Sequence, residues 1–225
     1  MKRKSSYTKI TIQSIYQLNE LNEKNNLIPI NELEISIPGP GIYVDLEKIP
    51  KSVSVLKFNY NYRNLPCEIP LNINSVYFYE FYYPIEELPN TIEHIQIHKG
   101  FNHPVDKLGD HLKSIDFGWN FNQPVDDLPS SLEKVVFYSS FTYPINNLPS
   151  NIKFIHIFNP KYNLESIKTL PKSLILLQLG MDNNLHNDFN FTFDLKGKNY
   201  VSLNTDTNYD SQKQVYLKNI YFYKN

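Results

Sequence analysis

The chain has 225 residues, of which 41% are hydrophobic and 20% charged, a composition typical of a folded globular protein. Its 22 lysines and arginines nearly balance 23 aspartates and glutamates, so the net charge of -1 predicts no nucleic-acid or membrane-surface partner. No apolar window of about 18 residues occurs, so no membrane-spanning helix is expected. A single cysteine excludes an intrachain disulfide and a multi-cysteine metal site, which favours an intracellular, cytoplasmic location.

Residues 1–26 are predicted to form an N-terminal cap. Within this segment Ile12, Ile15, Leu18 and Leu21 recur at three-residue steps, which indicates a helix between positions 11 and 24. We expect this helix to cover the first unit of the repeat domain that follows, because a stack of repeats exposes apolar surface at its ends.

Residues 27–181 contain about eight copies of a unit of about 20 residues. Within each unit an apolar pair two positions apart, such as Ile95 and Ile97, lies in a short alternating stretch that is typical of a half-buried strand. A unit this short has no room for a long crossover helix, so the units must stack as coils. The predicted fold is therefore a repeat solenoid, mainly β, with one parallel sheet of about eight strands and little helix. The most regular repeated positions are Phe81, Phe101, Phe121 and Phe141, followed by Pro84, Pro104, Pro124 and Pro144.

Residues 182–225 lose the repeat spacing. Phe189, Phe191, Phe193 and Leu195 alternate with polar residues, which favours a strand, and further alternating stretches follow. We expect this segment to form a small antiparallel β cap over the last coil.

The units that begin Phe101-Asn102-His103-Pro104-Val105 and Phe121-Asn122-Gln123-Pro124-Val125 resemble FNIP repeats, a relative of leucine-rich repeats known from amoebae and their giant viruses. The resemblance covers about two thirds of the chain. It departs from the family pattern at Tyr82 and Thr142, which replace the asparagine, and at Gly109, which replaces the second proline. The resemblance implies a curved, leucine-rich-repeat-like solenoid whose usual role is protein–protein interaction, located in the host cytoplasm if the protein is viral.

The residues that flank each inward pair are expected to face outward on the sheet, where repeat proteins usually bind. Aromatic and histidine side chains collect there, and tyrosine is a common interface anchor, so we predict a protein partner of unknown identity. The alternative is that lateral ladders of rings merely stabilise the sheet. The candidate partner-binding residues are Tyr77, Tyr79, His94, Gln96, His98, Asp116, Tyr138, His156 and Phe158.

Catalysis, a metal site and a cofactor are not predicted. His94, His98 and Asp116 suggest a metal site, but residues four apart on one strand are separated by ~13 Å. Asp116 is the one acidic residue among the central outward positions, whereas a glycosidase needs two carboxylates. A carbohydrate-active or other enzyme on a parallel β-helix, and a purely structural repeat protein, remain the alternative functions.

Two repeated residue types are instead expected to stabilise the coils. Asn102 and Asn122 recur one unit apart and are predicted to bond the backbone of adjacent turns. The repeated phenylalanines are predicted to stack in the core.

Overall fold

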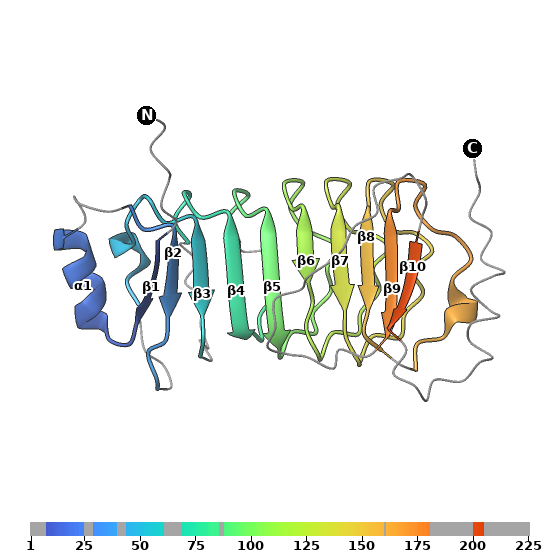
Figure 1. Ribbon diagram of the computed structural model, residues 1–225, viewed down its shortest axis with the longest axis horizontal. Coiled ribbons are helices and arrows are strands. Elements are labelled where there is room, and N and C mark those ends of the chain that lie inside the picture. Colours follow the sequence, from blue (N-terminus) through green and yellow to red (C-terminus); the bar gives the residue numbers. More distant parts are fainter. Residues whose placement is uncertain are drawn as a thin grey trace.

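The protein is described here from a computed structural model. The structure describes residues 8–24, 29–39, 44–60, 69–85, 88–159, 161–180 and 200–204. In this part of the chain ten strands form one sheet in sequence order, and every strand pairs in parallel with the next (Figure 1). The strands are β1 (Lys9–Ile12), β2 (Glu32–Ile35), β3 (Val55–Phe58), β4 (Ser75–Glu80), β5 (His94–Lys99), β6 (Ser114–Asp116), β7 (Lys134–Phe137), β8 (Phe154–Ile157), β9 (Leu176–Gly180) and β10 (Tyr200–Asn204).

Helix is limited, among the described residues, to α1 (Ile15–Lys24) and two short 3-10 turns, Leu46–Lys48 and Leu164–Ser166. No helix in these ranges has the length and apolar character needed to cross a bilayer.

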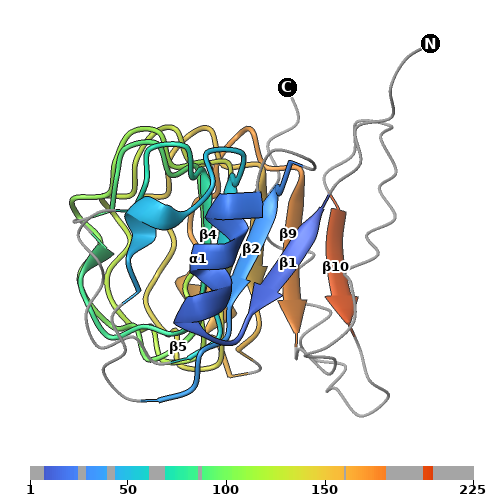
Figure 2. The same ribbon diagram turned by 90° about the vertical axis from the view of Figure 1, so that its left-hand side faces the viewer.

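The predicted leucine-rich-repeat-like solenoid with one parallel sheet and little helix is confirmed. The repeat domain supplies β2 to β9, and β1 and β10 add one strand at each end. Ile95 pairs with Ile115, and Ile115 pairs with Val135, so equivalent positions of successive units lie on neighbouring strands. Figure 2 shows the sheet along one side of the coils and the turns along the other.

Each Leu-Pro step precedes a turn that leads the chain into the next strand. The carbonyl oxygen of Pro89 accepts a hydrogen bond from the N–H of Ile92 at 3.0 Å, an i to i+3 bond that closes a β-turn. Gly109 replaces the proline in its unit, and its carbonyl accepts from the N–H of Leu112 at 3.2 Å. The substitution therefore keeps the turn, because the bond uses the carbonyl and not the proline ring.

The core is a stack of phenylalanine rings inside the coils. The ring centroids of Phe81, Phe101, Phe121 and Phe141 follow one another at 6.0, 5.8 and 6.1 Å. Phe117, which directly follows β6, lies 3.9 Å from Phe121, so rings stack within one coil as well as between successive coils. Each buried ring contributes roughly 1.5–3 kcal/mol of burial free energy. This confirms the prediction that the repeated phenylalanines form the core.

Asparagine side chains tie successive turns together, as the repeat predicted. The Oδ1 atom of Asn102 accepts the backbone N–H of Asn122 at 2.8 Å, and Asn122 in turn accepts the N–H of Thr142 at 2.9 Å. These bonds satisfy backbone donors in turns that have no strand partner. The asparagine ladder is therefore structural.

The N-terminal helix is shorter than its apolar pattern predicted. The N–H of Gln17 donates to Ser14 Oγ at 3.4 Å, and the N–H of Ser14 donates to Gln17 Oε1 at 3.1 Å, a capping box that sets the start of α1. Thr11 precedes this cap and lies in β1, which the helical spacing did not indicate. Leu18 of α1 is fully buried and belongs to the same hydrophobic core as the coils. The capping role of the helix stays a prediction.

The strand described in the C-terminal segment differs from the prediction. β10 pairs with β9 in parallel, with Tyr200 opposite Leu176, so the antiparallel arrangement predicted for 182–225 is wrong for this strand. The spacing of 24 residues is close to the 22 that separate Leu176 from its partner Phe154, so β10 continues the solenoid. Alternation predicts a strand but not its direction. The remainder of 182–225 lies outside the described residues.

Candidate functional site

The outward side chains of β2 to β8 form the outer face of the sheet, opposite the phenylalanine core. The strand register places the predicted outward residues side by side across neighbouring strands. Their exposure and chemistry change from strand to strand, so the face has three parts. Its central row consists of Glu34, Lys57, Tyr77, Gln96, Asp116, Val136 and His156, so the row has a second acidic residue, Glu34, besides the predicted Asp116.

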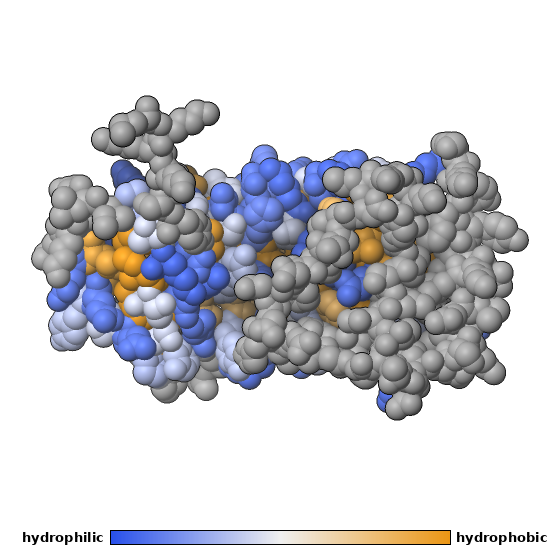
Figure 3. Space-filling model, viewed as in Figure 1, coloured by the Kyte–Doolittle hydropathy of each residue, from blue (hydrophilic) through white to orange (hydrophobic). Residues whose placement is uncertain are grey.

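The first part, over β1 to β3, is a network of paired charges. Lys9 Nζ lies 2.6 Å from Glu34 Oε2, and Lys57 Nζ lies 2.8 Å from Glu32 Oε1. The hydrogen bond from Lys9 holds the pKa of Glu34 below its ordinary value and raises the pKa of Lys9 itself. Figure 3, which views this face, shows hydrophilic residues over β2 and β3. Glu34 therefore stays ionised beside Lys9, and Glu32 is paired with Lys57.

The second part, over β4 and β5, is the accessible part. Tyr79 is 46% exposed, and its ring stacks on the ring of His98 with centroids 4.8 Å apart. Lys99 Nζ lies 4.9 Å from the Tyr79 ring centroid and 2.6 Å from Glu80 Oε1. Tyr77 beside them is half-buried, and Gln96 is exposed. The result is a rigid pair of rings with polar groups around it.

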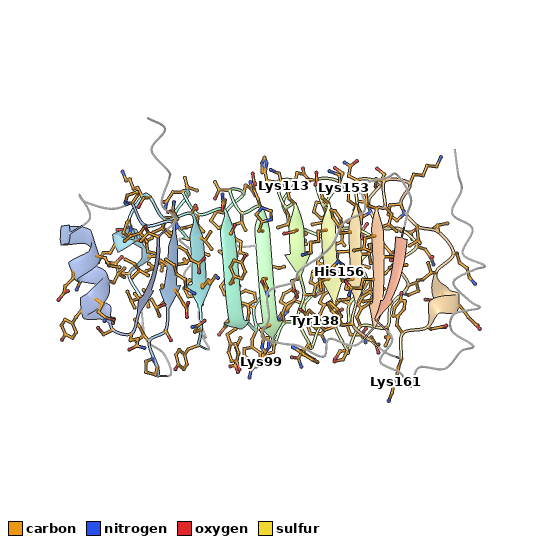
Figure 4. The ribbon with its side chains drawn as sticks, in the orientation of Figure 1. Lys99, Lys113, Tyr138, Lys153, His156 and Lys161 are labelled. Atoms are coloured by element: carbon orange, nitrogen blue, oxygen red, sulfur yellow. The ribbon has the colours of Figure 1, made fainter. Side chains whose placement is uncertain are left out.

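The third part, over β7 and β8, is buried, contrary to the prediction of an exposed face. Tyr138, His156 and Phe158 keep only 8%, 4% and 6% of their surface exposed. The Tyr138 ring lies 5.3 Å from Phe158 and 5.4 Å from Trp119, so these large rings cover one another. Burial lowers the pKa of His156 to about 4. Figure 4 shows Tyr138 and His156 over the sheet, but such buried side chains are not accessible to a partner.

Trp119 is the residue of this face that the sequence did not reveal. In the repeat spacing the position between His98 and Tyr138 is Gly118, which has no side chain. Gly118 adopts a φ of 71°, and the N–H of Trp119 then donates to the carbonyl of His98 at 2.9 Å. The Trp119 ring lies 6.4 Å from His98 and 5.4 Å from Tyr138, so it fills the vacant place. The sequence did contain one signal: Gly118 has no side chain at a position where the neighbouring units carry rings.

A pocket of about 150 Å³ opens on the outer face between β4 and β7. His94 and Ser114 form one wall, with His94 Nδ1 2.8 Å from Ser114 Oγ. Partial burial lowers the pKa of His94, so its ring is neutral at pH 7. Asp116 also lines the pocket, and its Oδ2 accepts a hydrogen bond from the Tyr138 hydroxyl at 3.1 Å. Among the described residues no three histidine, cysteine or carboxylate side chains converge as metal ligands would.

Comparisons with known proteins identify no family for this chain. No protein-family model matches the sequence, and no curated protein matches it. One chain of a solved structure, "Structure of the Toll - Spatzle complex, a molecular hub in Drosophila development and innate immunity", is similar with a TM-score of 0.46 and 14% identity. The match covers 78% of this chain and 27% of that chain. FNIP-repeat identity stays a prediction that rests on the residue pattern.

Proposed function

We propose that this protein is a non-catalytic interaction module that binds a protein partner through the outer face at β4 and β5. The observation that carries the proposal is the exposed Tyr79 ring, stacked on His98 and flanked by the Lys99–Glu80 ion pair. Such a ring offers a large contact area whose orientation is already fixed, so binding costs little side-chain entropy. The neighbouring Gln96 and Lys99 supply hydrogen-bond donors for a polar rim.

The carboxylates of this face do not favour an enzyme. A glycosidase needs one carboxyl group that stays protonated near neutral pH and a second that is ionised. Glu34 has a lowered pKa because Lys9 donates to it, and Glu32 lies 2.8 Å from Lys57. Neither is placed to donate a proton, which supports a binding role.

The test is affinity capture from a cell lysate with the full chain as bait, followed by mass spectrometry. The face variant replaces Tyr77 and Tyr79 with serine and Gln96 with alanine. The control variant replaces Tyr16 and Tyr143 with serine, because these tyrosines are 81% and 38% exposed but lie outside the face. We expect the wild type and the control variant to capture the same protein, and the face variant to lose it.

Both variants must keep the wild-type circular dichroism spectrum and unfolding midpoint, so that loss of capture reports the surface. Capture that is equal for the face and control variants would overturn the proposal. A bait that captures no protein in any form would favour the purely structural role. The intracellular location remains a prediction.

A further inference from the structure

The pocket between β4 and β7 contains an unusual lysine. Lys134 is half-buried and lines the pocket together with His94, Gln96, Ser114 and Asp116. The pocket has a volume of about 150 Å³, equal to that of a cavity known to hold a benzene-sized group, so one side chain of a partner can enter.

Other lysines on or beside the sheet have a carboxylate partner, and Lys134 has none among the described residues. The ion pairs are Lys9 with Glu34 at 2.6 Å, Lys57 with Glu32 at 2.8 Å, Lys99 with Glu80 at 2.6 Å, Lys113 with Glu93 at 2.9 Å and Lys153 with Glu133 at 2.9 Å. Placing a cation in a partly dehydrated site without a counter-charge is unfavourable. A bound anion would remove that cost.

The carboxylate of Asp116 also lines the pocket, but Lys134 forms no ion pair with it. Both oxygens of Asp116 already accept hydrogen bonds, Oδ1 from the N–H of Gly118 at 3.2 Å and Oδ2 from Tyr138. The positive charge of Lys134 contributes, after burial, to the lowered pKa of His156 and, with other charges, to that of His94. The two histidines are therefore neutral at pH 7, and Lys134 is the cation of this site.

We propose that the pocket receives the side-chain carboxylate of an aspartate or glutamate from a protein partner, with Lys134 as its counter-charge. Gln96 carries amide hydrogens that can complete the coordination of the carboxylate oxygens. The proposal rests on the proposed function and deepens it, because the pocket adjoins Tyr77 of the accessible surface. A side-chain carboxylate needs one counter-charge, which Lys134 supplies, and the net charge of -1 argues against nucleic acid.

The test uses short peptides capped at both ends, so that a side chain supplies the one carboxylate. Acetyl-Gly-Gly-Glu-Gly-Gly-amide is titrated into the full protein, and the ring resonances of the six histidines are followed by NMR. We expect a saturable shift of the His94 and His156 resonances with the glutamate peptide and no shift with the matched glutamine peptide. A phosphoserine peptide that binds where the glutamate peptide does not would overturn the choice of a carboxylate.

The variant Lys134→Gln keeps an unbranched polar side chain, slightly shorter than that of lysine, and removes its charge. We expect it to weaken the peptide by about tenfold or more, because it removes the counter-charge of a partly buried pair. Lys153→Gln is the matched control, since Lys153 lies at the edge where β8 begins and is already paired with Glu133 (Figure 4). Equal weakening in both variants would show non-specific attraction and overturn the proposal, as would no saturable shift for the wild type.

The same variant separates this inference from the proposed function. If Lys134→Gln still captures the partner that the face variant loses, the outer face binds and the carboxylate pocket is wrong. If neither variant changes capture but the glutamate peptide binds through Lys134, the pocket is real and the proposed surface is wrong.

Discussion

Removing one ring from the phenylalanine stack tests whether the coils are held together as the structure indicates. Phe121 is 1% exposed, and its ring centroid lies 3.9 Å from Phe117, 5.8 Å from Phe101 and 6.1 Å from Phe141. The variant Phe121→Ala removes contacts both within its own coil and with the coils on either side. We expect a loss of about 3–5 kcal/mol in the free energy of unfolding, the range for a fully buried phenylalanine.

Two further variants separate ring stacking from apolar volume. Phe121→Leu keeps most of the apolar volume but loses the aromatic contacts, so we expect a smaller loss of about 1–1.5 kcal/mol. Leu71→Ala is the control, because Leu71 is an apolar residue of a repeat turn that is 75% exposed. A surface change of this kind is expected to alter stability by less than about 0.5 kcal/mol.

The measurement is urea unfolding followed by far-UV circular dichroism and by the fluorescence of Trp119, the single tryptophan. Circular dichroism reports the whole sheet, whereas Trp119 reports the coils beside Phe121. If Phe121→Ala costs no more than Leu71→Ala, the ring stack does not hold the coils together and the account of the core is wrong. Equal losses for the alanine and leucine variants would show that volume contributes nothing at this position.

Two other changes follow from the backbone and from burial. Gly118→Ala should cost about 2–3 kcal/mol by chemical denaturation, because its φ is 71° and a Cβ would lie 2.5 Å from the carbonyl oxygen of His98; Gly109→Ala, which lacks a positive φ, should change stability little. The pKa of His156 is lowered from 6.5 to about 4, so as the pH falls the unfolded state takes up the proton at a higher pH than the folded state does. The free energy of unfolding should therefore fall by about 3 kcal/mol as the pH drops from 7 to 4. His156→Gln should flatten that pH dependence relative to His111→Gln, and an unchanged slope would contradict the burial of His156.

The inward half of the fold follows from the sequence because a solenoid repeats its requirements. Every coil must place apolar side chains at the same positions, so the spacing of residues such as Ile95 and Ile115 predicts both the strands and their register. A residue that differs from the repeat pattern does not disturb the fold when it keeps the backbone hydrogen bond. Gly109, for example, supplies the same turn carbonyl as the proline it replaces. The residues of the core were therefore predictable from one amino-acid sequence.

The outward half is only partly predictable. Alternation assigned Tyr138, His156 and Phe158 to the outer face, but it does not tell whether other atoms cover a face. The contribution of Trp119 was also hidden, because the positive φ at Gly118 shifts the ring out of the repeat spacing. Burial of an outward side chain depends on contacts between residues distant in sequence, which periodicity does not contain.

This difference between the two faces indicates which positions would set the specificity of the proposed interaction. Inward positions are fixed by the core, so a change there costs stability in every coil it touches. Outward positions carry no such requirement, and the face varies from paired charges at Glu34 through exposed rings at Tyr79 to buried rings at Phe158. Lys134 lines the pocket where the accessible and buried parts meet, and it forms no ion pair with the described carboxylates. Substitutions at Tyr79 or Lys134 should therefore change binding with little loss of stability, whereas substitutions at Phe158 should lower stability first.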